Sequence, residues 1–227
     1  MGTALYQLAG IGMESKERKH FYGQIEESAV EESSSEEITK EEVTIDFEAL
    51  KEMNEDIAGW ILFDKNGISY PVLQGKDNEE YLYTMADGTK NPAGSIFLDA
   101  LCSPDFEDAH TIIYGHNMKD LSMFGKLKQY GTKKDYYQEN KYFTIYTPDG
   151  AFRYEIFAWY EAAEDDSVYQ VGSWEEESFG EFVAQMIKRR YRDTEVTADK
   201  NDKIVTLSTC SSAGMRFVVH GKRIERD

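Results

Sequence analysis

Two side chains near the C-terminus are placed to do nucleophilic chemistry together. Cys210 ends the segment IVTLSTC, and Arg216 follows it after five residues rich in Ser and Gly. The β-branched run Ile204–Leu207 and the run after Arg216 each predict a strand, and so short a connection between them predicts a hairpin. A hairpin would put the thiol and the guanidinium side by side at one rim of a sheet.

A thiol becomes a useful nucleophile when a partner lowers its pKa or manages its proton, and histidine is the usual partner. His116 comes directly after the predicted strand Thr111–Gly115, so it would meet Cys210 if the two strands run parallel. The other three histidines are expected outside the domain, at the opposite rim, or about 13 Å along the last strand: His20, His110 and His220.

Each residue also has an ordinary structural explanation. Cys210 could be a small buried hydrophobic residue, His116 could satisfy a turn, and Arg216 could be a solvated charge on an edge strand. A disulfide to Cys102, the second cysteine, would consume the thiol. Because Cys, His and Arg do not by themselves name a reaction, the residues alone leave open a non-catalytic β-domain with a structural cysteine.

Positioning these side chains requires a sheet, and the sequence predicts about seven to nine short strands after Gly59. Short helices are expected at Asn78–Thr84 and Met123–Tyr130. A longer amphipathic helix is expected at Phe179–Tyr191, with Ser178 as its candidate N-cap. A mostly antiparallel barrel or sandwich with peripheral helices accommodates this pattern.

The N-terminal part differs from the rest in composition. Glu14–Ala29 favours a helix, whereas the Glu- and Ser-rich segment Glu26–Glu42 predicts a solvated linker rather than an element of the fold. Asp46 is a candidate N-cap for a helix beginning at Phe47. We therefore expect a stalk and linker in residues 1–44 and the folded domain in residues 45–227.

The composition also excludes several classes of function. A formal net charge of −18 would repel a phosphate polymer, so no nucleic-acid partner is expected. The glutamate clusters lack the ligand spacing of a calcium site, and we predict no metal and no cofactor. No stretch approaches the roughly 20 apolar residues of a membrane span.

Several segments resemble the sortases, the cysteine transpeptidases of Gram-positive cell surfaces. TLSTC followed by Arg216 resembles their TLxTC…R signature, and IIYGHNM around His116 resembles their histidine segment. DFEALKEMNEDIAGWI, YPVLQ, DNEEYLY and the long helix before the cysteine strand resemble class B sortases in particular. The resemblance extends from about Ile45 to the C-terminus.

This resemblance implies an eight-stranded β-barrel with N-terminal helices, and it implies transpeptidation. Cys210 would attack the Thr carbonyl of a sorting motif of the NPQTN or SPxTG type in a secreted protein, forming a thioacyl intermediate. His116 would act as general acid and then base, and Arg216 would hold the carbonyl or the oxyanion. Ser208 and Thr209 would line the pocket. A cell-wall peptide amine from a peptidoglycan precursor, or a pilin lysine, would release the product.

Two further points follow from the resemblance. Ser212 stands where some class B members carry an acidic residue, which excludes a Cys-His-Asp triad through that position and favours Cys, His and Arg. An N-terminal membrane helix, missing from this sequence, would anchor the enzyme on the extracellular face of the cell membrane, with Leu5–Glu42 as a juxtamembrane stalk. A pilin-polymerising sortase and a thiol endopeptidase that uses water remain alternatives.

Overall fold

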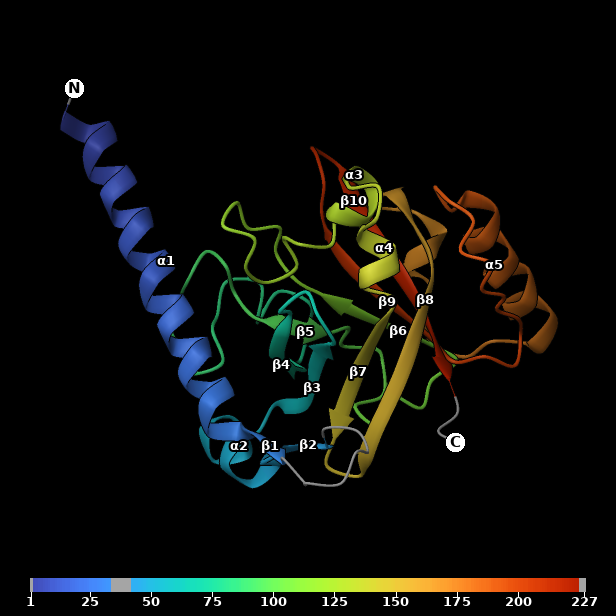
Figure 1. Cartoon of the computed structure of the whole chain (residues 1–227), viewed down its shortest axis with the longest axis horizontal. Coiled ribbons are helices and arrows are strands. Elements are labelled where there is room, and N and C mark those ends of the chain that lie inside the picture. The colour runs from blue at the N-terminus through green and yellow to red at the C-terminus, as the bar shows by residue number, and fades with distance from the viewer. Residues whose placement is uncertain (1, 34–41, 225–227) are drawn as a thin grey trace. The chain divides into compact units, whose positions relative to one another are not determined.

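The computed structural model describes residues 2–33 and 42–224 and divides the chain into two compact units, Met1–Glu55 and Asp56–Asp227. The first unit contains two helices and a two-stranded sheet (Figure 1): α1 (Gly2–Ala29), β1 (Val30–Ser33), β2 (Glu42–Ile45) and α2 (Phe47–Met53). Because the first unit extends to Glu55, α2 belongs to the same unit as α1. A stalk that ends at residue 44 stays a prediction.

The prediction of a solvated linker over Glu26–Glu42 is wrong at both of its ends. Residues 26–29 continue α1, and β1 pairs antiparallel with β2 from Val30↔Ile45 to Ser33↔Glu42. The Asp46 amide also donates to the Ala29 carbonyl at 2.9 Å. Backbone pairing and buried Ala29 and Ile45 therefore order the glutamate-rich sequence. The middle of the predicted linker, residues 34–41, lies outside the described residues.

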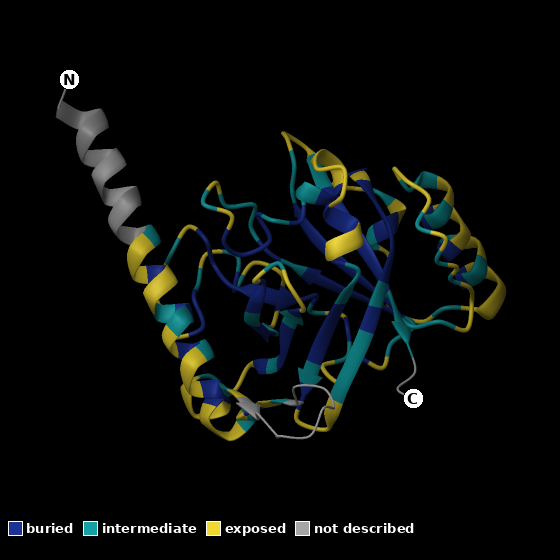
Figure 2. Ribbon diagram, viewed as in Figure 1, coloured by how far each residue is buried: buried dark blue, intermediate teal, exposed yellow. Residues whose placement is uncertain are grey.

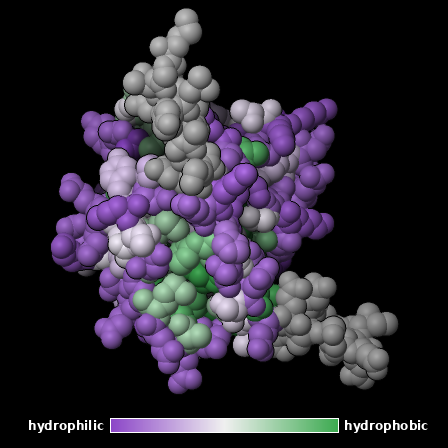
Figure 3. All heavy atoms as spheres, turned by 90° about the vertical axis from the view of Figure 1, so that its left-hand side faces the viewer, coloured by the Kyte–Doolittle hydropathy of each residue, from purple (hydrophilic) through white to green (hydrophobic). Residues whose placement is uncertain are grey.

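The N-cap predicted for the second helix is confirmed. The Asp46 side chain accepts a hydrogen bond from the Ala49 amide at 3.0 Å, which satisfies one of the free amides in the first turn of α2. None of the helices in the described ranges is both long and apolar enough to cross a membrane. The face drawn in Figure 3 is mostly hydrophilic, with apolar residues gathered in a patch near its centre.

The second unit is built on a closed eight-stranded barrel, which confirms the predicted mainly-β fold. Around the barrel the order is β10-β8-β7-β3-β4-β5-β6-β9, and the pairs β4–β5 and β6–β9 are parallel. In chain order the strands are β3 (Ile57–Phe63), β4 (Ser69–Leu73), β5 (Ile96–Leu98), β6 (His110–Tyr114), β7 (Tyr142–Thr147), β8 (Gly150–Ala163), β9 (Ile204–Cys210) and β10 (Met215–Ile224).

Most residues in the strands that carry the candidate site, β6, β9 and β10, are buried (Figure 2), and intermediate burial is confined to the strand ends. In β9 the six residues from Ile204 to Thr209 are all buried, because one face lines the barrel and the other is covered by the segment between β8 and β9. In that segment α5 (Glu176–Arg189) packs Phe179, Val183 and Met186 against a cluster that includes Tyr160 and Val218. The predicted amphipathic helix is confirmed.

The N-cap of α5 is Glu175 rather than the predicted Ser178. Glu175 has an extended backbone, with φ −79° and ψ 143°, and the Ser178 hydroxyl donates back to the Glu175 carbonyl at 2.8 Å. Two acidic residues, Glu176 and Glu177, occupy the first turn, where the helix dipole favours negative charge. These two carboxylates therefore stabilise a helix that begins at Glu176.

Both shorter predicted helices are wrong. In the segment predicted at Met123–Tyr130, the first residue has a positive φ of 51°, outside the right-handed helical region, and residues 124–128 form successive turns. Only the end of the predicted range is helical, in the short α3 (Gln129–Thr132), which α4 (Tyr136–Glu139) follows. Residues 78–84 form successive turns, and the Asp77 carboxylate before them accepts from the amides of Glu79 and Glu80 at 3.0 Å each. Side-chain bonding to the backbone competes successfully with helix formation there.

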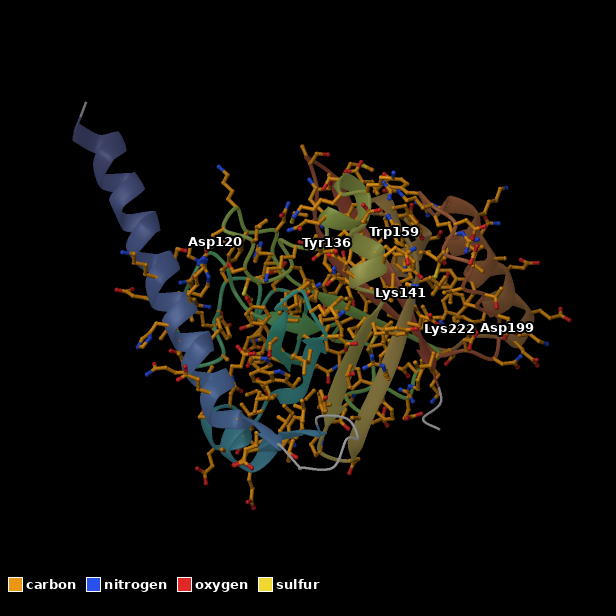
Figure 4. All side chains as sticks on the ribbon, in the orientation of Figure 1. Asp120, Tyr136, Lys141, Trp159, Asp199 and Lys222 are labelled. Atoms are coloured by element: carbon orange, nitrogen blue, oxygen red, sulfur yellow. The ribbon has the colours of Figure 1, made fainter. Side chains whose placement is uncertain are left out.

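An aromatic cluster holds α3 and α4 against β8. The Tyr130 ring lies 4.8 Å from that of Tyr136 and 5.5 Å from that of Trp159, centroid to centroid. Tyr137 contacts the other side of the cluster, with its centroid 5.1 Å from that of Trp159. Tyr136 and Trp159 are labelled in Figure 4. These ring contacts hold α3 and α4, which follow the loop after His116, against β8.

Candidate active site

The predicted hairpin is confirmed, and it places Cys210 directly opposite Arg216. Strands β9 and β10 are antiparallel, with the register Arg216↔Cys210 and Val218↔Ser208. Directly opposed residues have Cα atoms about 4.5–5.5 Å apart. In the connection the Ser211 amide donates to the Met215 carbonyl at 3.0 Å. The thiol and the guanidinium therefore begin from neighbouring positions at one rim of the barrel.

The parallel pairing that brings His116 to the same rim is also present. Tyr114 of β6 pairs with Ser208 of β9, and the Gly115 amide donates to the Ser208 carbonyl at 3.1 Å. Two residues beyond this pair, the chain reaches His116 on one strand and Cys210 on the other. The Asn117 side-chain amide donates to the Cys210 carbonyl at 2.9 Å, which ties the two strand ends together.

Gly115 permits this approach because a larger residue has no room there. A Cβ atom at this position would lie 2.4 Å from Cδ1 of Ile96 and 2.7 Å from Cδ2 of Phe124. Any side chain at position 115 would push β6 away from β5 or displace the loop that follows. The glycine before the histidine is therefore a packing requirement of this rim.

A backbone carbonyl determines which nitrogen of the neutral His116 ring carries the hydrogen. Its Nε2 lies 2.7 Å from the Leu82 carbonyl oxygen. A carbonyl only accepts hydrogen bonds, so Nε2 carries a hydrogen and the neutral ring keeps its lone pair on Nδ1. The Tyr83 ring lies beside the imidazole, with 5.6 Å between centroids. His116 is half-buried, and Nδ1 is the atom available for proton transfer.

The two cysteines differ in a way that favours Cys210 as the nucleophile. Both thiols are free, which contradicts the disulfide alternative. Cys102 is buried, and that burial raises its pKa to about 12. A thiol of that pKa stays protonated and inert at neutral pH. Cys210 is half-buried at the rim, where the candidate partners of a nucleophile lie.

Arg216 is engaged by an acidic residue that sequence reasoning missed. Its Nη1 lies 2.6 Å from Oε1 of Glu164, and the two side chains are 31% and 51% exposed. Glu164 follows β8, and its amide donates to the Gly214 carbonyl at 3.2 Å, which holds it beside the hairpin connection. No spacing rule marks this glutamate, because it is about fifty residues from Arg216 in the sequence.

The structure places Ser208 and Thr209 on opposite faces of β9. Ser208 shares the face of Cys210, is 1% exposed, and hydrogen-bonds through its hydroxyl to that of Tyr169 at 2.9 Å. Thr209 faces the other side and is 2% exposed, and its hydroxyl has no hydrogen-bond partner among residues 2–33 and 42–224. A substrate-binding role for either residue stays a prediction.

His110 and His220 do not reach the rim. Both are fully buried, and both hydrogen-bond to the hydroxyl of Thr206, at 2.7 and 2.9 Å. Thr206 lies four residues before Cys210 along β9. Of the histidines in the second unit, His116 is therefore the one placed at the end of the cysteine strand.

Comparison with known proteins identifies the fold and its chemistry. The family model described as "Sortase domain" matches residues 61–224. The chain belongs to the sortase family. Sortases are cysteine transpeptidases of Gram-positive cell surfaces, so the chain is an enzyme of that class.

Two curated relatives place the sortase in class B. Sortase B of Listeria monocytogenes is 32% identical over 232 residues, covering 100% of this chain and 94% of the relative. Sortase B of Staphylococcus aureus is 30% identical over 167 residues, covering 74% of this chain and 68% of the relative. The class B character expected from the sequence is thereby confirmed.

Solved structures agree with this assignment. Sortase B from Bacillus anthracis in complex with AAEK1 has a TM-score of 0.81 and 32% identity, covering 94% of this chain and 99% of the other. A Staphylococcus aureus sortase B–substrate complex has a TM-score of 0.74 and 30% identity, covering 80% of this chain and 85% of the other. The sortase described here therefore shares both the fold and the sequence of class B enzymes.

Proposed function

We propose that this class B sortase cleaves a sorting motif near the C-terminus of secreted proteins through a thioacyl intermediate on Cys210. The observation that carries the proposal is the meeting of two strand ends and a hairpin at one rim, where Cys210, His116 and Arg216 lie. The Cys210 sulfur would form a bond to the Thr carbonyl carbon of the motif, and the peptide C–N bond would break. The second half of the substrate would leave as an amine.

In this mechanism His116 moves the protons. The imidazolium would give its Nδ1 proton to the leaving amine, while Leu82 keeps the Nε2 hydrogen in place. The neutral ring would then take a proton from the incoming amine as it attacks the thioester, and Cys210 would leave as the thiolate. Arg216, whose charge is fixed, would stabilise the oxyanion formed in each half-reaction.

We propose surface proteins that bear a sorting motif as donors and a cell-wall peptide amine as the acceptor. One solved Staphylococcus aureus relative is a sortase B–substrate complex, which supports a substrate site in this fold. The reaction belongs at the extracellular face of the cell membrane, where secreted proteins meet peptidoglycan precursors. Membrane anchoring of the full-length protein is part of this proposal.

Cleavage of quenched fluorescent peptides carrying NPQTN, SPxTG and LPxTG motifs tests the proposal. Incubated with a cell-wall peptide amine, the enzyme should release the C-terminal half of one motif and join the Thr carboxyl to the added amine, as seen by mass spectrometry. Only hydrolysed product at saturating amine would instead indicate a thiol endopeptidase. Folded protein that cleaves none of the peptides would refute the proposal.

The Glu164 ion pair gives a second test of the role of Arg216. Because Glu164 competes with the substrate for the guanidinium, Glu164→Gln should raise kcat/KM about two- to fivefold at low salt, the range expected for an exposed ion pair. Added salt should erase the difference by screening. Asp165→Asn changes the charge equally one residue away and should have a smaller effect; equal effects would rule out a specific contact.

A further inference from the structure

A buried carboxylate lies behind the candidate site and takes no part in the proposed mechanism. Asp99 follows β5 and is 4% exposed. Its Oδ2 accepts from the Asn78 side-chain amide at 2.8 Å and from the Tyr114 hydroxyl at 2.9 Å, and its Oδ1 accepts from the Leu101 amide at 3.0 Å. A buried carboxylate is costly unless it is well bonded, and Asp99 meets that condition with donors from three segments.

One donor connects Asp99 to the strand that carries His116. Tyr114 lies two residues before the histidine on β6, and the hydrogen bond to Asp99 fixes the outer end of its side chain. The Tyr114 ring is stacked on that of Tyr169, with centroids 6.3 Å apart, and Tyr169 in turn bonds to Ser208 on the cysteine strand. Asp99 thus holds the Tyr114 side chain, which through Tyr169 is connected to Ser208 near the end of β9.

The second donor connects Asp99 to the turns that touch the histidine ring. The Asn78 side chain donates to Asp99 and accepts from the Ala100 amide at 2.8 Å, so it fastens the start of residues 78–84 to the end of β5. These turns present the Leu82 carbonyl and the Tyr83 ring to His116. Individual hydrogen bonds hold this segment, because it has no regular secondary structure. Backbone amides of Ser95 and Asn91 donate to the carbonyls on either side of Leu82 at 3.0 Å each, and the Asn78 side chain holds the start of the segment.

We propose that Asp99 is a positioning residue that holds His116 in its Nε2–H form. It acts along two routes: through Asn78, which fastens the turns that carry the Leu82 carbonyl, and through Tyr114, which lies on β6 two residues before His116. The inference rests on the proposed proton-transfer role of His116. The inference explains why Nδ1, rather than Nε2, is the nitrogen of His116 that is available for proton transfer. Acceptors are required on both oxygens at position 99, because the N–H groups of Asn78 and Leu101 that face them can only donate, whereas the Tyr114 hydroxyl could also accept.

Asp99→Asn is the informative change, since it keeps the shape and replaces one acceptor oxygen by an NH₂ group. We expect kcat for peptide cleavage to fall about tenfold with little change in KM, because a misdirected base weakens the chemical step. Nitrogen-15 spectra of the imidazole should change from one Nε2–H form of His116 to a mixture of tautomers. The spectra are recorded on protein shown to be folded by circular dichroism, because the neutral imidazole of an unfolded chain is itself a mixture of tautomers.

The matched control is Asp108→Asn, which removes a carboxylate that accepts from the Ser103 amide at 2.6 Å, whereas the side chains of Asn78 and Tyr114 bond to Asp99. It should leave kcat and the tautomer unchanged. If Asp99→Asn does not fold, Asn78→Ala at an exposed position should produce the same mixture of tautomers. Wild-type kcat together with a single Nε2–H form in a folded Asp99→Asn or Asn78→Ala variant would overturn the proposal.

The spectra also separate this inference from the proposed function. If the wild-type enzyme cleaves no peptide, the proposed function fails, but the tautomer of His116 in the two variants can still be measured. If the wild-type enzyme cleaves peptides and neither variant alters the tautomer or kcat, only the positioning role of Asp99 fails.

Discussion

Cys210→Ala is expected to reduce peptide cleavage by at least about a thousandfold, whereas Cys102→Ala should keep turnover within about twofold of the wild type. The first change removes the sulfur that would form the thioacyl bond. The second removes a buried thiol whose pKa of about 12 keeps it protonated at neutral pH. The two substitutions are chemically identical, so they separate loss of the nucleophile from loss of a sulfur atom.

The measurement is kcat/KM for the cleaved fluorescent peptide, together with labelling by a thiol-reactive probe. The folded wild type should label at Cys210, and the Cys210→Ala variant should label only after unfolding. Activity that survives in Cys210→Ala, or that disappears in a folded Cys102→Ala variant, would move the nucleophile elsewhere and remove the basis of the mechanism.

Acidification is expected to destabilise the barrel strongly, because two histidines are buried in one hydrogen-bond chain. The Gln170 carbonyl lies 2.8 Å from Nδ1 of His110 and can only accept, so that nitrogen carries a hydrogen. Nε2 of His110 then accepts from the Thr206 hydroxyl, and the Thr206 oxygen accepts from Nδ1 of His220. This order requires a neutral His110, because a second hydrogen on its Nε2 would face the Thr206 hydroxyl hydrogen.

A proton added to either ring creates a donor without an acceptor. Nε2 of His220 is buried and has no hydrogen-bond partner within residues 2–33 and 42–224. Burial lowers the pKa of His110 from its usual 6.5 to about 4 and holds the pKa of His220 well below its usual range. The fold therefore selects the neutral form of both histidines.

The sign of the pH dependence follows from these shifts. Between pH 6.5 and 4 the unfolded chain binds protons at His110 that the folded chain does not, so stability is full above 6.5 and falls as the pH is lowered. For His110 alone the loss approaches about 3 kcal/mol, and His220 changes stability in the same direction.

Urea unfolding at pH 7.5 and pH 4.5 measures this loss directly. A His110→Gln, His220→Gln variant should lose most of the dependence on pH between these values, whatever its absolute stability. His20→Gln, which changes an exposed histidine of the first unit, should keep the wild-type dependence. Equal pH dependence in the double variant and the wild type would exclude the buried pair as the cause.

The sequence by itself determined several local elements and, through its motifs, indicated the family. The hairpin is predictable because five residues join two β-branched runs, so its geometry depends on neighbours in the chain. The N-cap at Asp46 and the apolar face of α5 are local in the same sense. The family was indicated by the segments around these residues, IIYGHNM at His116 and TLSTC followed by Arg216, in that order along the chain.

Local reasoning failed where a distant segment or a single backbone angle decided the outcome. The glutamate-rich sequence after α1 forms a strand because it pairs with β2, and charge composition contains no information about that partner. The helix predicted from Met123 begins with a positive φ and is replaced by successive turns over residues 124–128.

Only the tertiary structure decided how the site is assembled. The parallel pairing of β6 with β9 joins residues about ninety positions apart. The sequence analysis could only say that His116 would meet Cys210 if these two strands were parallel. Glu164 beside Arg216 and the Leu82 carbonyl beside His116 could not be predicted, since an exposed glutamate is common and every residue has a carbonyl. Residue type specifies which atoms can react, and the fold of distant segments specifies which of them meet.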